Sequence, residues 1–313
     1  MRIFKQVPNF NFLGRGRYAA ALSIILVSIS VGSLATQWLN LGLDFRGGIQ
    51  IEVGYQKPIT AEAVRKQLAT AGYEGVVVQS IGETGKDLTI SIADKGNLSK
   101  ADISNKVIDA LQKNTADKID VRRRDFVGGK VGKELRDDGG IAMLLALGGI
   151  MVYVMFRFEW RFALGAIVAT IHDVVITIGF FSVFQWPFDL TVMAAILAII
   201  GYSLNDTVVV YDRIRENFRK IRKGTTLEIT NTAMNQTLSR TVMTSFTTLL
   251  VVSSMYFFGG PSIQPFAIAL IIGIVVGTYS SIYVASAMVI ALKVDRSHLM
   301  PIPKQTDENG SHP

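Results

Sequence analysis

Apolar side chains gather into six long runs, separated by polar segments. A helix needs about 20 residues to cross the roughly 30 Å hydrocarbon core of a bilayer, and each run has that length or nearly so. The runs lie at about Tyr18–Trp38, Ile141–Phe156, Arg161–Phe184, Leu190–Tyr211, Thr241–Phe258 and Ile263–Leu292. The pattern therefore predicts a membrane α-helical bundle of six transmembrane helices, with helix 1 at residues 18–38 and helices 2–6 within residues 139–292.

Residues 39–138 show the pattern of a small folded domain between the first two helices. "IQIEV" alternates between apolar and polar residues as a strand does, and "TAEAVRKQLATAG" has the signals of a capped helix. Taken together, the segments follow the order strand, helix, strand, strand, helix, strand. That order is typical of an α+β ferredoxin-like fold. Arg122, Arg123 and Arg124 in the last strand alternate between its faces, which favours a solvated or interface surface over an anion-binding site.

Composition supports a membrane protein. Of the 313 residues 49% are hydrophobic, and the mean hydropathy is +0.35, which is high for a soluble chain of this size. Basic cytoplasmic loops account for the formal charge of +7, and because no nucleic-acid-binding motif accompanies it, we expect no nucleic-acid partner. The absence of cysteine excludes disulfides and thiolate metal sites.

The distribution of Lys and Arg predicts the orientation, because cytoplasmic loops accumulate these residues. With the N-terminus inside, fifteen Lys and Arg residues from Arg2 to Lys304 lie in inner segments, whereas the short outer loops "QWP" and "GGPS" carry none. Both termini are then cytoplasmic. The expected cytoplasmic segments are residues 1–17, 212–239 and 293–313, and residues from about 40 to 138 lie outside. A signal peptide ending at "SLA" is the alternative for the first run, but its apolar region exceeds the usual 7–15 residues.

Polar side chains inside predicted spanning helices are costly and therefore informative. Asp206, with Asn205 and Ser203 beside it, lies about 25 Å along the fourth helix. Arg240 opens the fifth helix at a similar depth, and threonines that follow it at helical spacing suit a hydrated seam between helices. The pair fits an ion pathway. It also fits a positive cytoplasmic flank with a carboxylate that balances the loop charge, and spacing alone leaves both interpretations open.

His172 and Asp173 lie in the middle of the third apolar run. A histidine beside a carboxylate can relay protons, because the imidazole titrates near neutral pH. The pair can also be a structural hydrogen bond between helices. Neighbouring residues in a helix do not share a face, and this favours the structural role.

Several long motifs resemble the SecF family of protein-export membrane proteins. They are "LGLDFRGGIQIEV" after the first helix, "VGGKVGKELRDDGG" before the second, "IHD" in the third, "IIGYSLNDTVVVYDRIREN" in the fourth, and "NQTLSRTVMTS" beyond it. The resemblance covers nearly the whole chain, in order and with the family's six-helix layout.

The resemblance implies a role in secretion. SecF-type subunits belong with the RND transporters, form half of a pseudo-symmetric bundle that SecD completes, and assist the SecYEG translocon of the bacterial inner membrane. The complex uses an ion gradient, of H⁺ or Na⁺, to draw unfolded polypeptide outward. Asp206 and Arg240 match charged residues of the family that are implicated in proton conduction, and a further aspartate belongs to SecD. The resemblance implies no enzymatic activity and no cofactor or metal.

Two other functions remain open. The chain could be half of an RND-type exporter of small molecules or lipids, although such exporters usually hold two outer domains and about twelve helices in one chain. It could also be a scaffold that stabilises the translocon without transporting ions, in which case Asp206 has a structural role. A measurement of ion flux would distinguish the scaffold from a subunit that is driven by an ion gradient.

Overall fold

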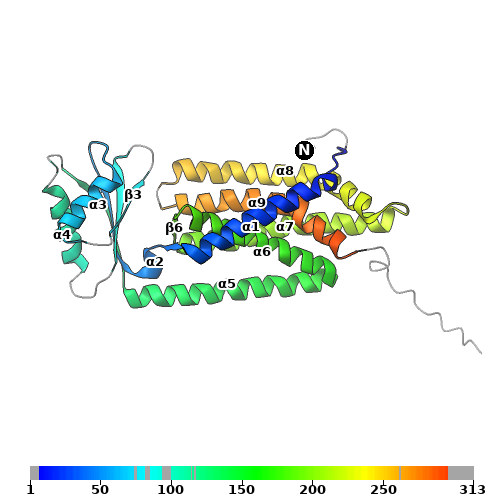
Figure 1. Ribbon diagram of the computed structural model, residues 1–313, viewed down its shortest axis with the longest axis horizontal. Coiled ribbons are helices and arrows are strands. Elements are labelled where there is room, and N and C mark those ends of the chain that lie inside the picture. The colour runs from blue at the N-terminus through cyan, green and yellow to red at the C-terminus, as the bar shows by residue number, and fades with distance from the viewer. Residues whose placement is uncertain are drawn as a thin grey trace, which may run out of the picture.

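The computed structural model describes residues 7–73, 76–81, 85–93, 100–113, 115, 118–260 and 262–294. It is elongated, with a small domain of strands and helices at one end and a bundle of long helices at the other (Figure 1). Across the described residues, six helices are long and apolar enough to cross a membrane. The fold class predicted from the sequence is therefore confirmed.

The bundle is built from six long helices, which lie along the long axis of the molecule (Figure 1). They are α1 (Gly16–Thr36, after the short turn η1, Leu13–Arg15), α5 (Gly129–Arg157), α6 (Trp160–Val183), α7 (Leu190–Lys220), α8 (Thr226–Phe258) and α9 (Gln264–Ala291). Much of α6, α7 and α9 is buried against other helices, whereas α5 and α8 are largely exposed. Exposed apolar residues of α5, such as Leu144, Leu145 and Phe156, suit contact with lipid or with another subunit.

Small side chains let α1 approach α6 closely. A Cβ atom added at Gly179 of α6 would overlap Ser30 of α1, so glycine is needed at this crossing. A few residues further along, the Ser33 and Ser182 hydroxyls form a hydrogen bond of 2.8 Å between the same two helices. Small residues and hydroxyl pairs of this kind are typical of helix packing in membranes.

The small domain contains a four-stranded antiparallel sheet with two helices. Its elements are β2 (Gly48–Gly54), α3 (Ala61–Thr70), β3 (Val77–Ile81), β4 (Asp87–Ala93), α4 (Lys100–Gln112) and β5 (Asp120–Val127). The strand order β3-β4-β2-β5 is the ferredoxin-like order. The predicted cap of α3 is also present, since the Thr60 hydroxyl accepts a hydrogen bond from the Ala63 amide at 3.3 Å.

Alternation along the strands gives this domain its own core. Ile49, Ile51 and Val53 of β2 are buried and pack with Leu68 of α3 and Val107 of α4. Burying a side chain of this size contributes about 1.5–3 kcal/mol. The domain therefore has a hydrophobic core separate from that of the bundle.

A glycine-rich junction joins the domain to the adjoining ends of the bundle helices. After α1 the chain forms β1 (Asn40–Leu41), which pairs in parallel with β6 (Pro187–Phe188), and then the single-turn helix α2 (Leu43–Arg46). Gly47 follows with a φ of 69°, and a Cβ atom there would collide with the backbone of Gly129 at the start of α5. Only glycine adopts this positive φ without strain and also avoids the collision, because it has no Cβ atom.

The three arginines of β5 all have partners. Arg122 pairs with Asp87 at 2.9 Å, and Arg124 donates to the Asn105 side chain at 2.9 Å. Arg123 pairs with Asp125 at 2.8 Å and also donates to the Ser262 hydroxyl, in the loop between α8 and α9, at 2.6 Å. This arrangement agrees with the predicted interface surface, because Arg123 connects the domain to the bundle.

Some predicted boundaries need correction. Helix 1 ends at Thr36 instead of residue 38, and Trp38 has a left-handed φ of 59°. The outer domain does not extend to residue 138, because β5 ends at Val127 and α5 begins at Gly129. The polar residues 129–138 continue the second spanning helix, since a helix needs apolar side chains only within the hydrocarbon core.

The predicted cytoplasmic loop 212–239 is mostly helical. Helix α7 continues to Lys220, with Glu216 accepting from Arg213 and Lys220 at helical spacing. Helix α8 begins at Thr226 behind a capping box of Thr225 and Glu228. Of the predicted cytoplasmic tail 293–313, residues 295–313 lie outside the described residues.

Candidate functional site

Asp206 is a buried carboxylate inside a spanning helix. It lies 16 residues after Leu190, the first residue of α7, which is roughly 24 Å along the helix. Only 3% of its surface is exposed, and its Oδ2 atom has no hydrogen-bond partner among the described residues. A buried oxygen without a partner carries a desolvation penalty. This oxygen is free to accept a proton or another cation.

Arg240 is placed on the neighbouring helix but does not pair with Asp206. Helices α7 and α8 pack against each other, and the Arg240 side chain is exposed. Within the described part of the chain, no ion pair of 4.0 Å or less joins Arg240 to the Asp206 carboxylate. Asn205 is also exposed, so both polar side chains lie on the outer surface of this half-bundle.

Three of the threonines after Arg240 satisfy their hydroxyls within their own helix, and the hydrated seam that their spacing suggested stays a prediction. Thr244, Thr247 and Thr248 each donate a hydrogen bond to a backbone carbonyl of their own helix, three or four residues earlier. Such bonds let hydroxyl residues lie in a helix without a polar neighbour. Thr241 differs, because its buried hydroxyl has no partner in the described residues.

His172 and Asp173 form a hydrogen bond with each other. The distance from His172 Nδ1 to Asp173 Oδ1 is 2.8 Å, and Asp173 is completely buried. Adjacent side chains leave a helix about 100° apart, yet the imidazole of His172 reaches the Asp173 carboxylate. Both the structural role and the relay role of the pair stay predictions.

Asp173 is hydrogen-bonded to the helix that carries Asp206. Its Oδ2 atom accepts hydrogen bonds from Ser203 at 2.5 Å and from Ser280 at 2.7 Å. Ser203 belongs to α7 and lies one turn before Asp206, whereas Ser280 belongs to α9. The structure therefore brings the His172–Asp173 pair and the helix that carries Asp206 into one polar centre.

Sequence reasoning missed the partners of this centre on the first and last helices. Ser23, Tyr279 and Ser280 are hydroxyl residues within apolar runs, where they usually satisfy their own helix. The sequence "TYSSIY" beside Gly277 was the available signal. It concentrates five hydroxyl side chains within six residues of a spanning helix.

Asp44 was also missed as a site residue. Its Oδ2 atom accepts a hydrogen bond from the backbone amide of Leu190 at 3.1 Å, and Asp189 caps the same helix end by accepting from Val192 at 2.9 Å. Carboxylates at a helix N-terminus satisfy free amides and interact favourably with the helix dipole. The outer end of α7 is therefore bonded directly to the glycine-rich junction.

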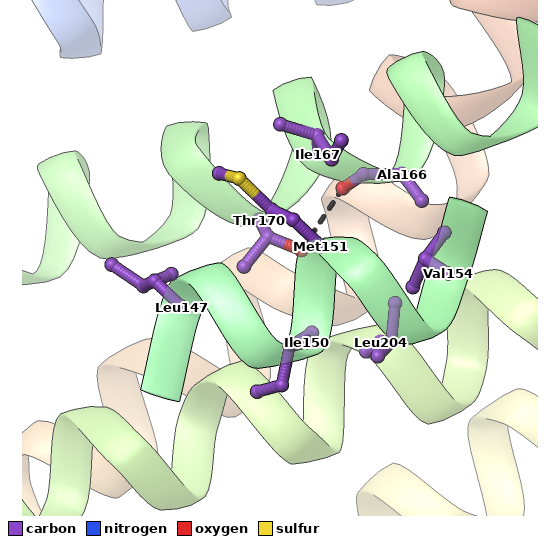
Figure 2. Close-up of a pocket in the computed structure, with 8 residues that line it drawn as sticks. All are labelled: Leu147, Ile150, Met151, Val154, Ala166, Ile167, Thr170 and Leu204. Atoms are coloured by element: carbon purple, nitrogen blue, oxygen red, sulfur yellow. Dashed lines mark hydrogen bonds between the residues drawn. The ribbon is translucent and has the colours of Figure 1, made fainter. Parts of the chain in front are cut away.

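Figure 2 shows a cavity in the membrane bundle that is not a candidate ion site. It lies among α5, α6 and α7, and its lining is apolar except for one hydroxyl. That hydroxyl belongs to Thr170 and donates to the Ala166 carbonyl at 2.9 Å. The lining residues are Leu147, Ile150, Met151, Val154, Ala166, Ile167, Thr170 and Leu204. In the described ranges, no group of three or more His, Asp or Glu residues could hold a metal ion.

Comparison with known proteins identifies the family. Residues 106–295 match the family described as protein export membrane protein SecD/SecF, C-terminal, and residues 32–59 match the SecD/SecF GG motif. The chain is 45% identical over 310 residues to the protein translocase subunit SecF of Vibrio alginolyticus, covering 99% of this chain and 98% of that one. The chain belongs to the SecF family. The SecF subunit of Pseudomonas aeruginosa is 47% identical over 309 residues, covering 98% of this chain and 99% of that one.

A solved structure supports this assignment. The crystal structure of SecDF from Thermus thermophilus, described as a translocon-associated membrane protein, superposes with a TM-score of 0.83 at 37% identity. The match covers 93% of this SecF-family chain but only 40% of the longer SecDF chain. Together with the six long apolar helices, these matches show a multi-pass membrane protein of the SecF family.

The GG motif gains a structural meaning from this match. Within residues 32–59 it contains Asp44, which accepts from the first residue of α7, and Gly47, which lies against the backbone at the start of α5. The motif thus connects the small domain to the helix that carries Asp206.

Proposed function

We propose that this SecF-family subunit uses the proton gradient to drive a late step of polypeptide translocation across the bacterial inner membrane. The observation that carries the proposal is Asp206, a carboxylate buried in a spanning helix with one oxygen left unpartnered among the described residues. A charged side chain at such depth costs about 2.5–3.5 kcal/mol even on the lenient insertion scale. This cost is explained if transport requires the side chain to alternate between its charged and its neutral form.

The energy available is sufficient for a conformational step. Moving one elementary charge through 100 mV releases about 2.3 kcal/mol. A few such steps exceed the cost of breaking several hydrogen bonds at about 1 kcal/mol each. The same carboxylate chemistry can bind Na⁺, so the coupling ion is H⁺ or Na⁺, and we favour H⁺. The function requires no cofactor and no enzymatic activity.

The exposed residues beside Asp206 support an ion path shared with SecD. Asn205 and Arg240 lie on the surface of this half-bundle, where the partner half would cover them. Closure of the bundle by SecD, or a shift of α8, would bring Arg240 into closer contact with Asp206. Its positive charge in that position would stabilise the ionised carboxylate and so control proton release.

Movement at Asp206 can reach the outer domain through rigid contacts. The carboxylate is part of α7, and the outer end of α7 is bonded to Asp44 in the junction that precedes β2. A second connection runs from Arg123 in β5 to Ser262. A shift of α7 would therefore turn the domain, which we propose touches the translocating polypeptide or SecD.

Orientation and compartment follow from charge. We propose that both termini and the short link between α7 and α8 are cytoplasmic, and that the outer domain is periplasmic. Arg213, Arg215, Arg219 and Lys220 crowd the inner end of α7, as the positive-inside rule requires. The partners are SecD, the SecYEG channel, the exported polypeptide and the lipid bilayer.

The test of this function imposes gradients on sealed inverted membrane vesicles that contain the complex and SecYEG. We expect a gradient of pH, acidic inside, to increase translocation of a slow-folding precursor beyond the level that ATP alone supports. A Na⁺ gradient of equal size should have no effect. If only the Na⁺ gradient increases translocation, the coupling ion is Na⁺ instead of H⁺. If neither gradient increases it, the non-transporting scaffold is favoured.

A further inference from the structure

A chain of hydrogen bonds extends from Asp173 across four spanning helices. At one end, the Asp173 carboxylate of α6 accepts from Ser203 of α7 and Ser280 of α9, both through Oδ2. Its Oδ1 atom is 2.8 Å from His172 Nδ1. Asp173 has no exposed surface, so no solvent replaces any of these partners.

The other end of the chain reaches α1. His172 Nε2 lies 3.1 Å from the Ser23 hydroxyl, which in turn lies 2.9 Å from the hydroxyl of Tyr279 on α9. Tyr279 donates to the backbone carbonyl of Ala19 at 2.6 Å, and its ring stacks on the imidazole at 6.2 Å between centroids. Four contacts in a row thus link the carboxylate to a carbonyl of α1.

Counting hydrogens shows that a neutral histidine beside a carboxylate leaves one of these four contacts unfilled. Carboxylate and carbonyl oxygens only accept, so the single hydrogen of Tyr279 is used on Ala19. The single hydrogen of Ser23 serves either His172 or Tyr279, but not both. Neutral His172 supplies one hydrogen, to Asp173. The chain then has three hydrogens for four contacts. In one of the contacts, two acceptor atoms therefore face each other with no hydrogen between them.

One additional proton fills the chain. With both ring nitrogens protonated, His172 donates to Asp173 and to Ser23, Ser23 donates to Tyr279, and Tyr279 donates to Ala19. The same count holds if the extra proton lies on Asp173 Oδ1 and Nε2 carries the ring hydrogen. In both forms the His172–Asp173 pair has no net charge, which suits a site enclosed by membrane helices better than a net charge of −1.

We propose that His172 and Asp173 form a second proton-binding site, distinct from Asp206, whose bound proton completes the hydrogen bonds that hold α1 against α6 and α9. When the pair loses this proton, Nε2 accepts from Ser23 and the contact between Ser23 and Tyr279 has no hydrogen. The position of α1 thus depends on the protonation of the pair. This goes beyond the proposed function, because the site binds its proton whether or not export is coupled to it.

Of the other ionisable groups on the surrounding helices, Tyr279 stacks on His172. Within the described residues, none of them forms a hydrogen bond or ion pair with His172 or Asp173. Four helices pack against α6, and their ionisable residues nearest to the pair along the sequence are Arg17 and Tyr18 of α1, Tyr153 and Arg157 of α5, Tyr202 and Asp206 of α7, and Tyr279 and Tyr283 of α9. Asp206 lies one turn from Ser203 on α7.

The test reads the protonation of Nε2 by solid-state ¹⁵N NMR. The chain has three histidines, so His298→Gln and His312→Gln leave His172 as the only signal. The labelled protein is prepared with its SecD partner in lipid bilayers at neutral pH. We expect Nε2 to carry a hydrogen and the second proton to lie on Nδ1 or, as the ¹³C shift of the carboxyl carbon reports, on Asp173. A bare Nε2 nitrogen overturns the proposal. A neutral ring with a hydrogen on Nε2 beside an ionised Asp173 lacks this second proton and would also overturn the proposal.

Two variants sharpen the result. Asp173→Asn removes the charge that holds the extra proton, so His172 should be neutral with one bare ring nitrogen, whereas two protonated ring nitrogens in this variant would contradict the shared site. Ser33→Ala is the matched control, since it removes a hydrogen bond between α1 and α6 outside the chain, and the protonation of the pair should not change. Co-purification with SecD verifies that each variant is folded. No transport is measured, so failure here is separate from failure of the proposed function.

Discussion

The Asp44 carboxylate accepts a hydrogen bond from the backbone amide of Leu190 at 3.1 Å, which ties the outer domain's base to the first residue of α7. The two residues are 146 positions apart in the sequence. Because α7 also carries Asp206, we propose that this bond couples the buried carboxylate to the domain that follows Asp44.

Replacement of Asp44 should therefore uncouple the domain from the ion site. Asp44→Leu removes the acceptor, costs about 1 kcal/mol of cap stabilisation, and should abolish gradient-dependent export while the subunit still inserts. Asp44→Asn keeps a side-chain oxygen that can accept from Leu190, so it should retain most of the activity. The measurement is export in vesicles per amount of complex. Equal activity of the Leu and Asn variants would show that the bond transmits nothing.

The proposed orientation predicts which cysteine probes react from outside. The chain has no cysteine, so single probes can be introduced without background. A cysteine at Lys86, in the outer domain, should react with a membrane-impermeant thiol reagent in intact spheroplasts. A cysteine at Lys220, at the inner end of α7, should react only after lysis. The reverse pattern would overturn the orientation.

The outer domain should lose stability at alkaline pH through Tyr55. Burial raises the pKa of the Tyr55 phenol from 10.0 to about 12, and its hydroxyl has no partner in the described part of the chain. The unfolded chain loses this proton near pH 10, whereas the folded domain retains it. The stabilising contribution is therefore complete below pH 10 and is lost as the pH rises through 12.

This prediction is tested by urea unfolding of residues 40–128 between pH 8 and 11. We expect a mixed helix–strand circular dichroism spectrum, cooperative unfolding, and a free energy of unfolding that falls more steeply with pH in the wild type than in Tyr55→Phe. Identical slopes would exclude Tyr55 as the cause. A disordered spectrum would show that the core around Ile51 and Leu68 does not suffice without the bundle.

Arg240 should be essential through its charge. Arg240→Met removes the positive group that controls the ionisation of Asp206 and should stop gradient-driven export. Arg240→Lys keeps the charge but loses the planar, five-donor guanidinium, so partial activity is expected. Arg222→Met, in the exposed link between α7 and α8, is a control that should leave export unchanged. If the Arg240→Met and Arg222→Met proteins export equally well, the role of Arg240 is only that of a cytoplasmic flank.

The sequence predicted the elements of this fold better than their ends. Apolar runs identify spanning helices because lipid tolerates little else, and all six were found. Their ends were misplaced where a helix leaves the membrane. Polar residues after Gly129 form the first turns of α5, and polar residues before Lys220 form the last turns of α7. In water, a segment with charged side chains can be helical as readily as it can form a loop.

The candidate site was predicted less completely. The burial of Asp206 followed from its place in an apolar helix, but the exposure of Arg240 depends on how α8 packs, which its local sequence does not determine. The contacts of Asp173 with Ser203 and Ser280 join residues on three helices. Such contacts arise from tertiary packing, and no local pattern of serines distinguishes them from hydroxyls that bond their own backbone.

The central claim is that Asp206 carries protons, and Asp206→Asn tests it most directly. The asparagine keeps the shape of the side chain but cannot alternate between charged and neutral forms. The measurement is export of a slow-folding secreted protein in membrane vesicles, with and without an uncoupler, normalised to the amount of complex with SecD. We expect the variant to assemble with SecD normally and to export at the rate that the wild type shows with uncoupler. Full uncoupler-sensitive stimulation in the variant would contradict the account and leave Asp206 a structural role.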